Sequence, residues 1–187
     1  MKIIELYEEE LPQEFDEAIK LIKRDCKSFL AQRGEGLLYR GVQKGLGKNI
    51  KTFSKKVPRT DRKPKNTLRS THQELDDWFN DNFGFRARSA AVFVTGDLRD
   101  ARSYGAAYAI FPIGDFEFLW SPNIGDLFIA LGNPENMEST LKNAEYKKTD
   151  LADAIESGHE IMLSCKEYYA LHIKEYSEDV LHIKNAL

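Results

Sequence analysis

One carboxylate stands at the head of an apolar run, where Glu160 is followed by Ile161, Met162 and Leu163. A short run of such residues next to a glycine is typical of a buried strand, and its first residue then lies at the rim of the sheet. A carboxylate placed there can meet positive charge that develops during a reaction. The alternative is an ordinary solvated residue at the start of a strand. Glu160 is therefore the first candidate catalytic residue.

A second candidate group ends another apolar run, over residues 36–42, where Tyr39 is followed by Arg40 and Gly41. A guanidinium offers a rigid fork of donors that suits phosphate groups. A glycine lets a planar group approach the backbone closely. The alternatives are a surface ion pair for Arg40 and a tight turn for Gly41. Together the two residues predict a binding edge at the end of this strand.

Basic side chains gather in one segment, although the net charge of the chain is −3. Residues 44–69 hold ten basic residues against one acid, Asp61, and they include Pro58 and Pro64. Such composition predicts a basic loop rather than a regular element. The loop is expected either to bind the phosphates of a nucleic acid or dinucleotide, or to be a solvated loop that balances an acidic body.

Composition limits the class of protein. A chain of 187 residues with 42% hydrophobic residues predicts one folded domain over residues 1–187. The first ten residues hold four glutamates, where a secretion signal would need basic and then apolar residues, so we expect no membrane segment and a cytoplasmic location. Cys26 and Cys165 are predicted to be reduced core residues. The four histidines lack zinc-ligand spacing, and no metal site is expected.

The elements that must position these groups are short. Strands are predicted over residues 2–7, 36–42, 89–96, 105–111, 116–120, 168–173 and 180–183, with a further strand from Glu160. Helices are predicted from residue 11 to Gly34, from a capping box at Thr71 and Glu74 to Gly84, over 98–104 behind an Asp97 cap, over 127–129, and from Thr149 or Asp150 to Gly158. The pattern indicates an α+β domain with many short strands and few helices.

Three segments resemble, in order and chemistry, the ADP-ribosyltransferase superfamily, which holds NAD in a cleft between two small sheets. They are the strand ending Tyr39-Arg40-Gly41, the strand over 92–96 with Ala101 and Tyr104 after it, and the strand from Glu160. Arg40-Gly41 resembles the arginine-serine-glutamate branch of toxins and viral transferases. The resemblance covers about residues 37–173 and implies an ADP-ribosyltransferase-like split β-sandwich with a few flanking helices.

The resemblance implies that NAD is the substrate and that its nicotinamide leaves from the ribose. Glu160 is then the catalytic residue, because it can stabilise the ribosyl cation and accept a hydrogen bond from a ribose hydroxyl. The implied NAD-binding residues are Tyr39, Arg40, Gly41, Phe93, Thr95 and Tyr104. Within this set, Arg40 is expected on the pyrophosphate or ribose. Tyr104 is expected on the nicotinamide ring, or else in the core, and Thr95 beside Glu160 or a ribose hydroxyl, or else as an edge-strand residue.

The acceptor of ADP-ribose is left open by the sequence. Transferases that act on arginine carry Glu or Gln two residues before the catalytic glutamate, and Gly158 occupies that position here. One extra residue also separates Ala101 from Tyr104, compared with the family pattern. His159 is expected to be structural, because it points away from the face of Glu160 in a regular strand. A protein side chain, a nucleic acid bound through residues 44–69, and water all remain possible acceptors.

Two other classes of function stay open beside mono-ADP-ribosyl transfer. One is an NAD glycohydrolase, which has water as its acceptor. The other is a non-catalytic module on the same fold that binds nucleic acid or protein through residues 44–69. Segments 86–89 and 111–116 also resemble a small phage-protein family of this type, which implies the host-cell cytoplasm as location. The oligomeric state is not predicted.

Overall fold

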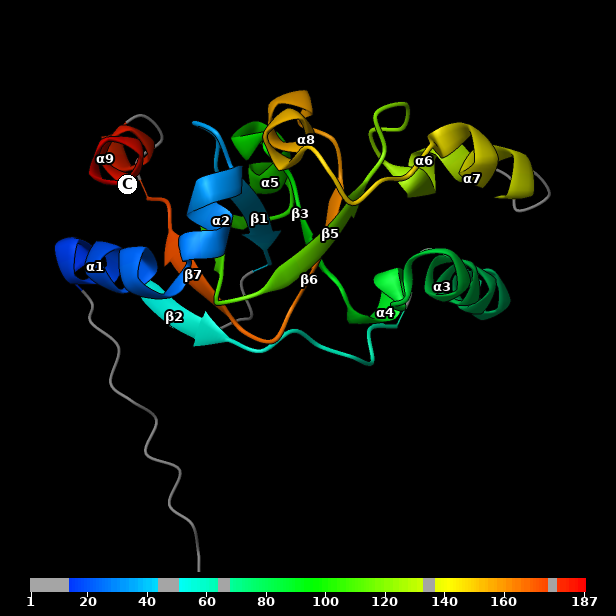
Figure 1. Ribbon diagram of the computed structural model, residues 1–187, viewed down its shortest axis with the longest axis horizontal. Coiled ribbons are helices and arrows are strands. Elements are labelled where there is room, and N and C mark those ends of the chain that lie inside the picture. The colour runs from blue at the N-terminus through cyan, green and yellow to red at the C-terminus, as the bar shows by residue number, and fades with distance from the viewer. Residues whose placement is uncertain (1–13, 44–50, 64–67, 133–136, 175–177) are drawn as a thin grey trace, which may run out of the picture.

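The computed structural model describes residues 14–43, 51–63, 68–132, 137–174 and 178–187. These residues form an α+β fold in which two antiparallel sheets are flanked by helices (Figure 1). The α+β class predicted from the sequence is confirmed. The predicted strand over residues 2–7 lies outside the described residues.

The larger sheet has four strands in the order β1-β4-β7-β2. Their bounds are Leu38–Val42 for β1, Ala106–Pro112 for β4, Tyr168–His172 for β7 and Phe53–Lys56 for β2. The smaller sheet has three strands in the order β3-β6-β5. Their bounds are Val92–Val94 for β3, Ile161–Cys165 for β6 and Phe116–Trp120 for β5. The predicted strands after Tyr104 are confirmed as β4 and β5, which belong to different sheets.

Among the described residues, one pair of residues joins the two sheets by backbone hydrogen bonds. The Tyr39 N–H donates to the Thr95 carbonyl at 2.7 Å, and the Thr95 N–H donates to the Tyr39 carbonyl at 2.9 Å. On one side of this pair β1 continues along β4, and on the other side β3 continues along β6. The sheets therefore separate past the pair, and the ends of β1 and β3 face one another across the split.

Helices cover the sheets in two groups with separate cores. The larger core is completed by α1 (Phe15–Asp25), α2 (Lys27–Gln32), α5 (Leu98–Ser103), α8 (Leu151–Ser157) and α9 (Glu178–Ala186). The smaller core is completed by α3 (Arg69–Phe83), α4 (Ala87–Ala90), α6 (Leu127–Leu131) and α7 (Met137–Ala144). Side chains alternate along β3 and β6, so Val94 and Ile161 join the larger core while Phe93 and Met162 face the smaller one.

Several predicted helix boundaries are correct and others are wrong. Asp97 caps α5 by accepting hydrogen bonds from the Arg99 and Asp100 backbone N–H groups at 2.7 and 3.3 Å. Gly84 and Gly158 end α3 and α8 in the left-handed conformation, with φ of 86° and 70°. The capping box at Thr71 is wrong, because α3 already begins at Arg69 and Thr71 is buried within it.

Four further features differ from the prediction. The helix expected up to Gly34 is broken at Cys26, whose φ of −108° and ψ of 29° separate α1 from α2. The segment predicted as a basic loop contains β2, which pairs with β7. The final strand predicted over 180–183 is instead part of α9, which buries Ile183. With nine helices among the described residues, the expectation of few helices is wrong.

Candidate active site

Glu160 lies directly before β6, and its backbone N–H donates to the Gly125 carbonyl at 2.8 Å. The register that pairs Val94 with Ile161 sets Glu160 beside Thr95, at the junction of the two sheets. Alternation along β6 gives Glu160 the same face as Met162, toward the smaller core. Its side chain is only 21% exposed, so Glu160 is not an ordinary solvated residue at a strand start.

Arg88 of α4 is the direct partner of this carboxylate. Its Nη1 donates to Glu160 Oε1 at 3.0 Å, and the Arg88 side chain is 14% exposed. The same Nη1 lies 4.0 Å from the Met162 sulfur, and the guanidinium carbon lies 4.6 Å from the centroid of the Phe93 ring. Burial raises the pKa of Glu160, and the Arg88 charge acts against that rise.

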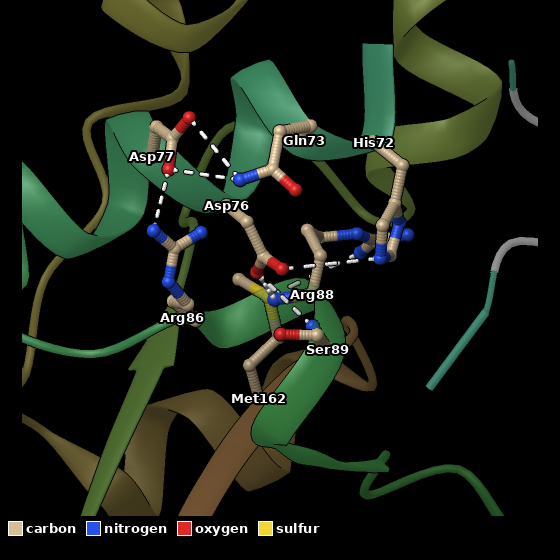
Figure 2. A network of polar contacts seen from close by, with 8 residues as sticks. All are labelled: His72, Gln73, Asp76, Asp77, Arg86, Arg88, Ser89 and Met162. Carbon is tan, nitrogen blue, oxygen red and sulfur yellow. Dashed lines mark hydrogen bonds and ion pairs between the residues drawn. The ribbon is translucent and has the colours of Figure 1, made fainter. Parts of the chain in front are cut away.

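Asp76 of α3 anchors the backbone of Arg88, as Figure 2 shows. The buried carboxylate of Asp76 accepts hydrogen bonds through Oδ1 from the backbone N–H groups of Arg88 and Ser89, at 2.8 and 3.0 Å. His72 lies beside Asp76, with its Nε2 3.9 Å from Asp76 Oδ2, and burial lowers the pKa of His72. These contacts fix the start of α4 against α3.

Two more guanidinium groups, those of Arg62 and Arg40, contact Phe93. Arg62, from the basic segment, has its guanidinium carbon 4.0 Å from the Phe93 ring centroid, and its backbone N–H donates to the Ser89 carbonyl at 3.2 Å. Arg40 of β1 reaches across the split and donates through Nη1 to the Phe93 carbonyl at 3.3 Å. Burial, together with repulsion from the Arg40 and Arg88 charges, lowers the pKa of Arg62 to about 10. The guanidinium groups of Arg62 and Arg88 thus lie over the Phe93 ring, Arg88 pairs with Glu160, and Arg40 contacts the Phe93 backbone.

Tyr104 and Gly41 occupy the adjoining edge of β1 and α5. Tyr104 is 57% exposed, so it is not a core residue. Burial raises the pKa of Tyr104, and the charges of Asp100, Asp126 and Glu160 act in the same direction. A Cβ at Gly41 would lie 1.8 Å from the Ala101 carbonyl oxygen, so α5 can pack here only against a glycine.

Thr95 and Tyr39 have structural contacts. The Thr95 hydroxyl donates to the Gly158 carbonyl at 2.6 Å and accepts from the Asp97 backbone N–H at 3.0 Å, so both of its hydrogen bonds are to backbone groups rather than to Glu160. Tyr39 is 5% exposed and lines a cavity of about 370 Å³ between α5, α8 and α9. Neither Glu160 nor any of the three arginines lines that cavity. The His159 ring Nδ1 is bonded to the Ser121 carbonyl at 2.9 Å, which suits a structural role.

The structure therefore brings Phe93 close to Arg40 and to Arg88, the partner of Glu160. Tyr104 and Gly41 lie at the edge of β1 and α5, and Thr95 and Tyr39 pair at the junction of the sheets. Sequence reasoning missed Arg88 and Asp76 as parts of the site, and it counted Arg62 only within a basic loop. No short spacing reveals Arg88 as the partner of Glu160, because 72 positions separate them. The charge of residues 44–69 was the one available signal for Arg62.

Comparison with known proteins gives no match to a family model, to a curated protein or to a solved structure. Among the described residues, no helix is long and apolar enough to cross a membrane. In the same ranges, no three His, Cys, Asp or Glu side chains gather as metal ligands.

Proposed function

We propose that the protein is an NAD-dependent mono-ADP-ribosyltransferase that breaks the nicotinamide–ribose bond of NAD. The observation that carries the proposal is the contrast of charges at the split between the sheets, where Glu160 faces the guanidinium groups of Arg62 and Arg88, with Arg40 beyond them. NAD matches this contrast, because it joins a doubly charged pyrophosphate to a ribose that becomes cationic as nicotinamide leaves.

One oxygen of the Glu160 carboxylate is available to bind the ribose. Arg88 occupies Glu160 Oε1, and no described residue donates a hydrogen bond to Oε2. A ribose hydroxyl can therefore donate to Oε2 while the carboxylate charge stabilises the neighbouring cation. The C–N bond breaks with its electron pair going to nicotinamide, and an acceptor oxygen or nitrogen then bonds to the ribose carbon and loses its proton. The attraction between the Glu160 carboxylate and the ribosyl cation strengthens as positive charge develops, so it stabilises the transition state more than bound NAD.

The remaining residues of the site suit binding rather than bond cleavage. Guanidinium groups bind phosphate oxygens through two parallel donors, which fits Arg40 and Arg62 to the pyrophosphate. Tyr104 exposes a ring that suits stacking on nicotinamide. Gly41 stays a predicted contact for the carboxamide through its backbone, although its α-carbon also packs against α5.

The proposed acceptor is a protein or a nucleic acid, and the modified group is not an arginine side chain. Gly158, at the position where arginine-specific enzymes carry an acid or amide, is committed to the left-handed end of α8 and to the hydrogen bond from Thr95. A protein or a nucleic acid remains the candidate acceptor, and a phage origin would place the reaction in the host-cell cytoplasm. If water is the acceptor, the same site makes the protein an NAD glycohydrolase.

Measuring nicotinamide release from NAD by the purified protein, with and without host lysate, tests this proposal. Labelling of a lysate component from NAD supports transfer, and release without lysate supports hydrolysis. Glu160→Gln keeps the side-chain shape but removes its charge, so we expect release to fall roughly a hundredfold to a thousandfold, the size of effect found when one group that stabilises developing charge is removed. Full activity of a folded Glu160→Gln variant would contradict the proposal.

A further inference from the structure

Glu160 is held by a residue from outside the three motif segments. The family resemblance predicts Thr95 as its neighbour in function, yet the Thr95 hydroxyl is bonded to the Gly158 carbonyl and the Asp97 N–H. The hydrogen bond to the Glu160 carboxylate comes from Arg88 instead, at 3.0 Å. Met162 and the ring of Phe93 line the guanidinium, so its orientation is restricted by packing as well as by charge.

Arg88 is in turn held at its backbone. Asp76 is 3% exposed, and its Oδ1 accepts both the Arg88 N–H and the Ser89 N–H at the start of α4. A buried carboxylate that accepts two backbone hydrogen bonds is a strong anchor, because leaving those groups unpaired would be costly. The adjacent Arg86 shows the contrast, since its side chain is 45% exposed and pairs with Asp77 at the surface (Figure 2).

We propose that Arg88 is the positioning residue of Glu160: it fixes Oε1 so that Oε2 faces the bound ribose, and Asp76 holds Arg88 in that place. The role in catalysis rests on the proposed function, because it concerns the same reaction. The effect of Arg88 on the ionisation of Glu160 does not depend on the proposed function, because it follows from the contact between the two side chains alone.

The charged and titratable groups around Glu160 decide how strong this control is. They are Arg88 from α4, Arg62 from the basic segment, Asp126 before α6, Tyr104 after α5 and Tyr146 after α7. Burial and Asp126 raise the pKa of Glu160, while Arg88, through its charge and its hydrogen bond, and Arg62 lower it. Loss of Arg88 removes the partner in direct contact, so Glu160 should stay protonated to higher pH.

Arg88→Met tests the inference, because it keeps an unbranched, flexible side chain beside Phe93 and Met162 and removes the guanidinium charge. The protonation of Glu160 is followed by NMR of carboxyl-labelled glutamate, with the resonance assigned by its loss in Glu160→Gln. We expect the midpoint of the Glu160 titration to move to higher pH in Arg88→Met and to stay close to wild type in Arg88→Lys. Arg86→Met is the matched control and should leave it unchanged. If Arg88→Met does not fold, Arg88→Gln replaces it.

Nicotinamide release across pH gives the second readout. The rate in Arg88→Met should fall most at acidic pH and recover toward alkaline pH, because Glu160 must be ionised to meet the ribosyl cation. Asp76→Asn should shift the Glu160 titration and the pH dependence of nicotinamide release in the same direction as Arg88→Met, but by a smaller amount. An unchanged Glu160 midpoint in a folded Arg88→Met or Arg88→Gln variant overturns the inference. A shifted midpoint in a protein that releases no nicotinamide supports Arg88 as the partner and counts against the proposed function alone.

Discussion

At the scale of single residues, Arg40 has the surroundings that suit its proposed role in binding the NAD pyrophosphate. Its guanidinium lies in the split between the sheets, where it makes a hydrogen bond of 3.3 Å to the Phe93 carbonyl. Burial lowers the pKa of Arg40, so the site keeps a poorly solvated cation with no described carboxylate in direct contact. Such a group gains from an incoming phosphate, which replaces the solvation that it has lost.

We expect Arg40→Ala to raise the KM for NAD much more than it lowers kcat. A phosphate contact contributes alike to bound NAD and to the transition state, so its loss weakens binding without changing the chemical step. A hydrogen bond to a charged group contributes about 1.5–3 kcal/mol, which corresponds to roughly a tenfold to hundredfold rise in KM. Steady-state nicotinamide release measures both constants. An unchanged KM with a collapsed kcat would instead give Arg40 a part in the chemical step.

The residue scale also shows what a sequence can predict about a site. Glu160 is identifiable because a lone acid before an apolar run is unusual, and Arg40 because a strand ends on it. Arg88 and Asp76 are not identifiable in this way. Their contacts depend on α3 and α4 packing against the smaller sheet, and that arrangement is set by Phe79, Leu119 and their neighbours in the smaller core rather than by any local spacing.

At the scale of elements, the basic segment contributes to the site as well as to the surface. Arg62 lies over the Phe93 ring, whereas Lys55 pairs with Glu167 and Arg59 pairs with Asp61 at the surface. The pairing of β2 with β7 carries the segment along the edge of the larger sheet. Among the described basic residues of the segment, Arg62 is exposed but stacks on the Phe93 ring, whereas Lys55 and Arg59 pair with acids at the surface.

Two sets of substitutions in the basic segment should have different effects. Arg62→Gln should reduce nicotinamide release and acceptor labelling together, because it removes a cation from the proposed NAD site. Replacing the exposed Lys51, Lys56 and Lys63 by Ser should leave release from free NAD nearly unchanged. If these lysines bind a nucleic-acid acceptor, labelling should fall and its salt dependence should flatten.

Arg59→Gln is the control for Arg62→Gln, since Arg59 is an arginine of the same segment with a side chain that is 74% exposed. Equal loss of nicotinamide release in Arg59→Gln and Arg62→Gln would place the effect in the segment as a whole. Full labelling at low and high salt by the lysine variant would remove nucleic acid as a partner of this segment.

At the scale of the whole molecule, the α+β class and most strands were predictable, because alternating and apolar runs are strong signals. The last helix was not, since the sequence over 180–183 is equally compatible with a strand, and packing of Ile183 against the larger core decides for α9. The order of strands within the two sheets could not be read from local patterns either. It depends on contacts such as β1 with β4 and β3 with β6, which join distant parts of the chain.

The single backbone pair between Tyr39 and Thr95 has a consequence for motion. Two hydrogen bonds are all that the strand ladders place between the sheets among the described residues, so this pair is a natural pivot. The amide protons of Tyr39 and Thr95 should exchange with solvent deuterium faster than those within the β4–β7 ladder, because opening there breaks fewer bonds. If NAD binds at the split as proposed, ADP-ribose should slow exchange at these two amides specifically. Equal slowing throughout both sheets would mean that the molecule opens as one cooperative unit.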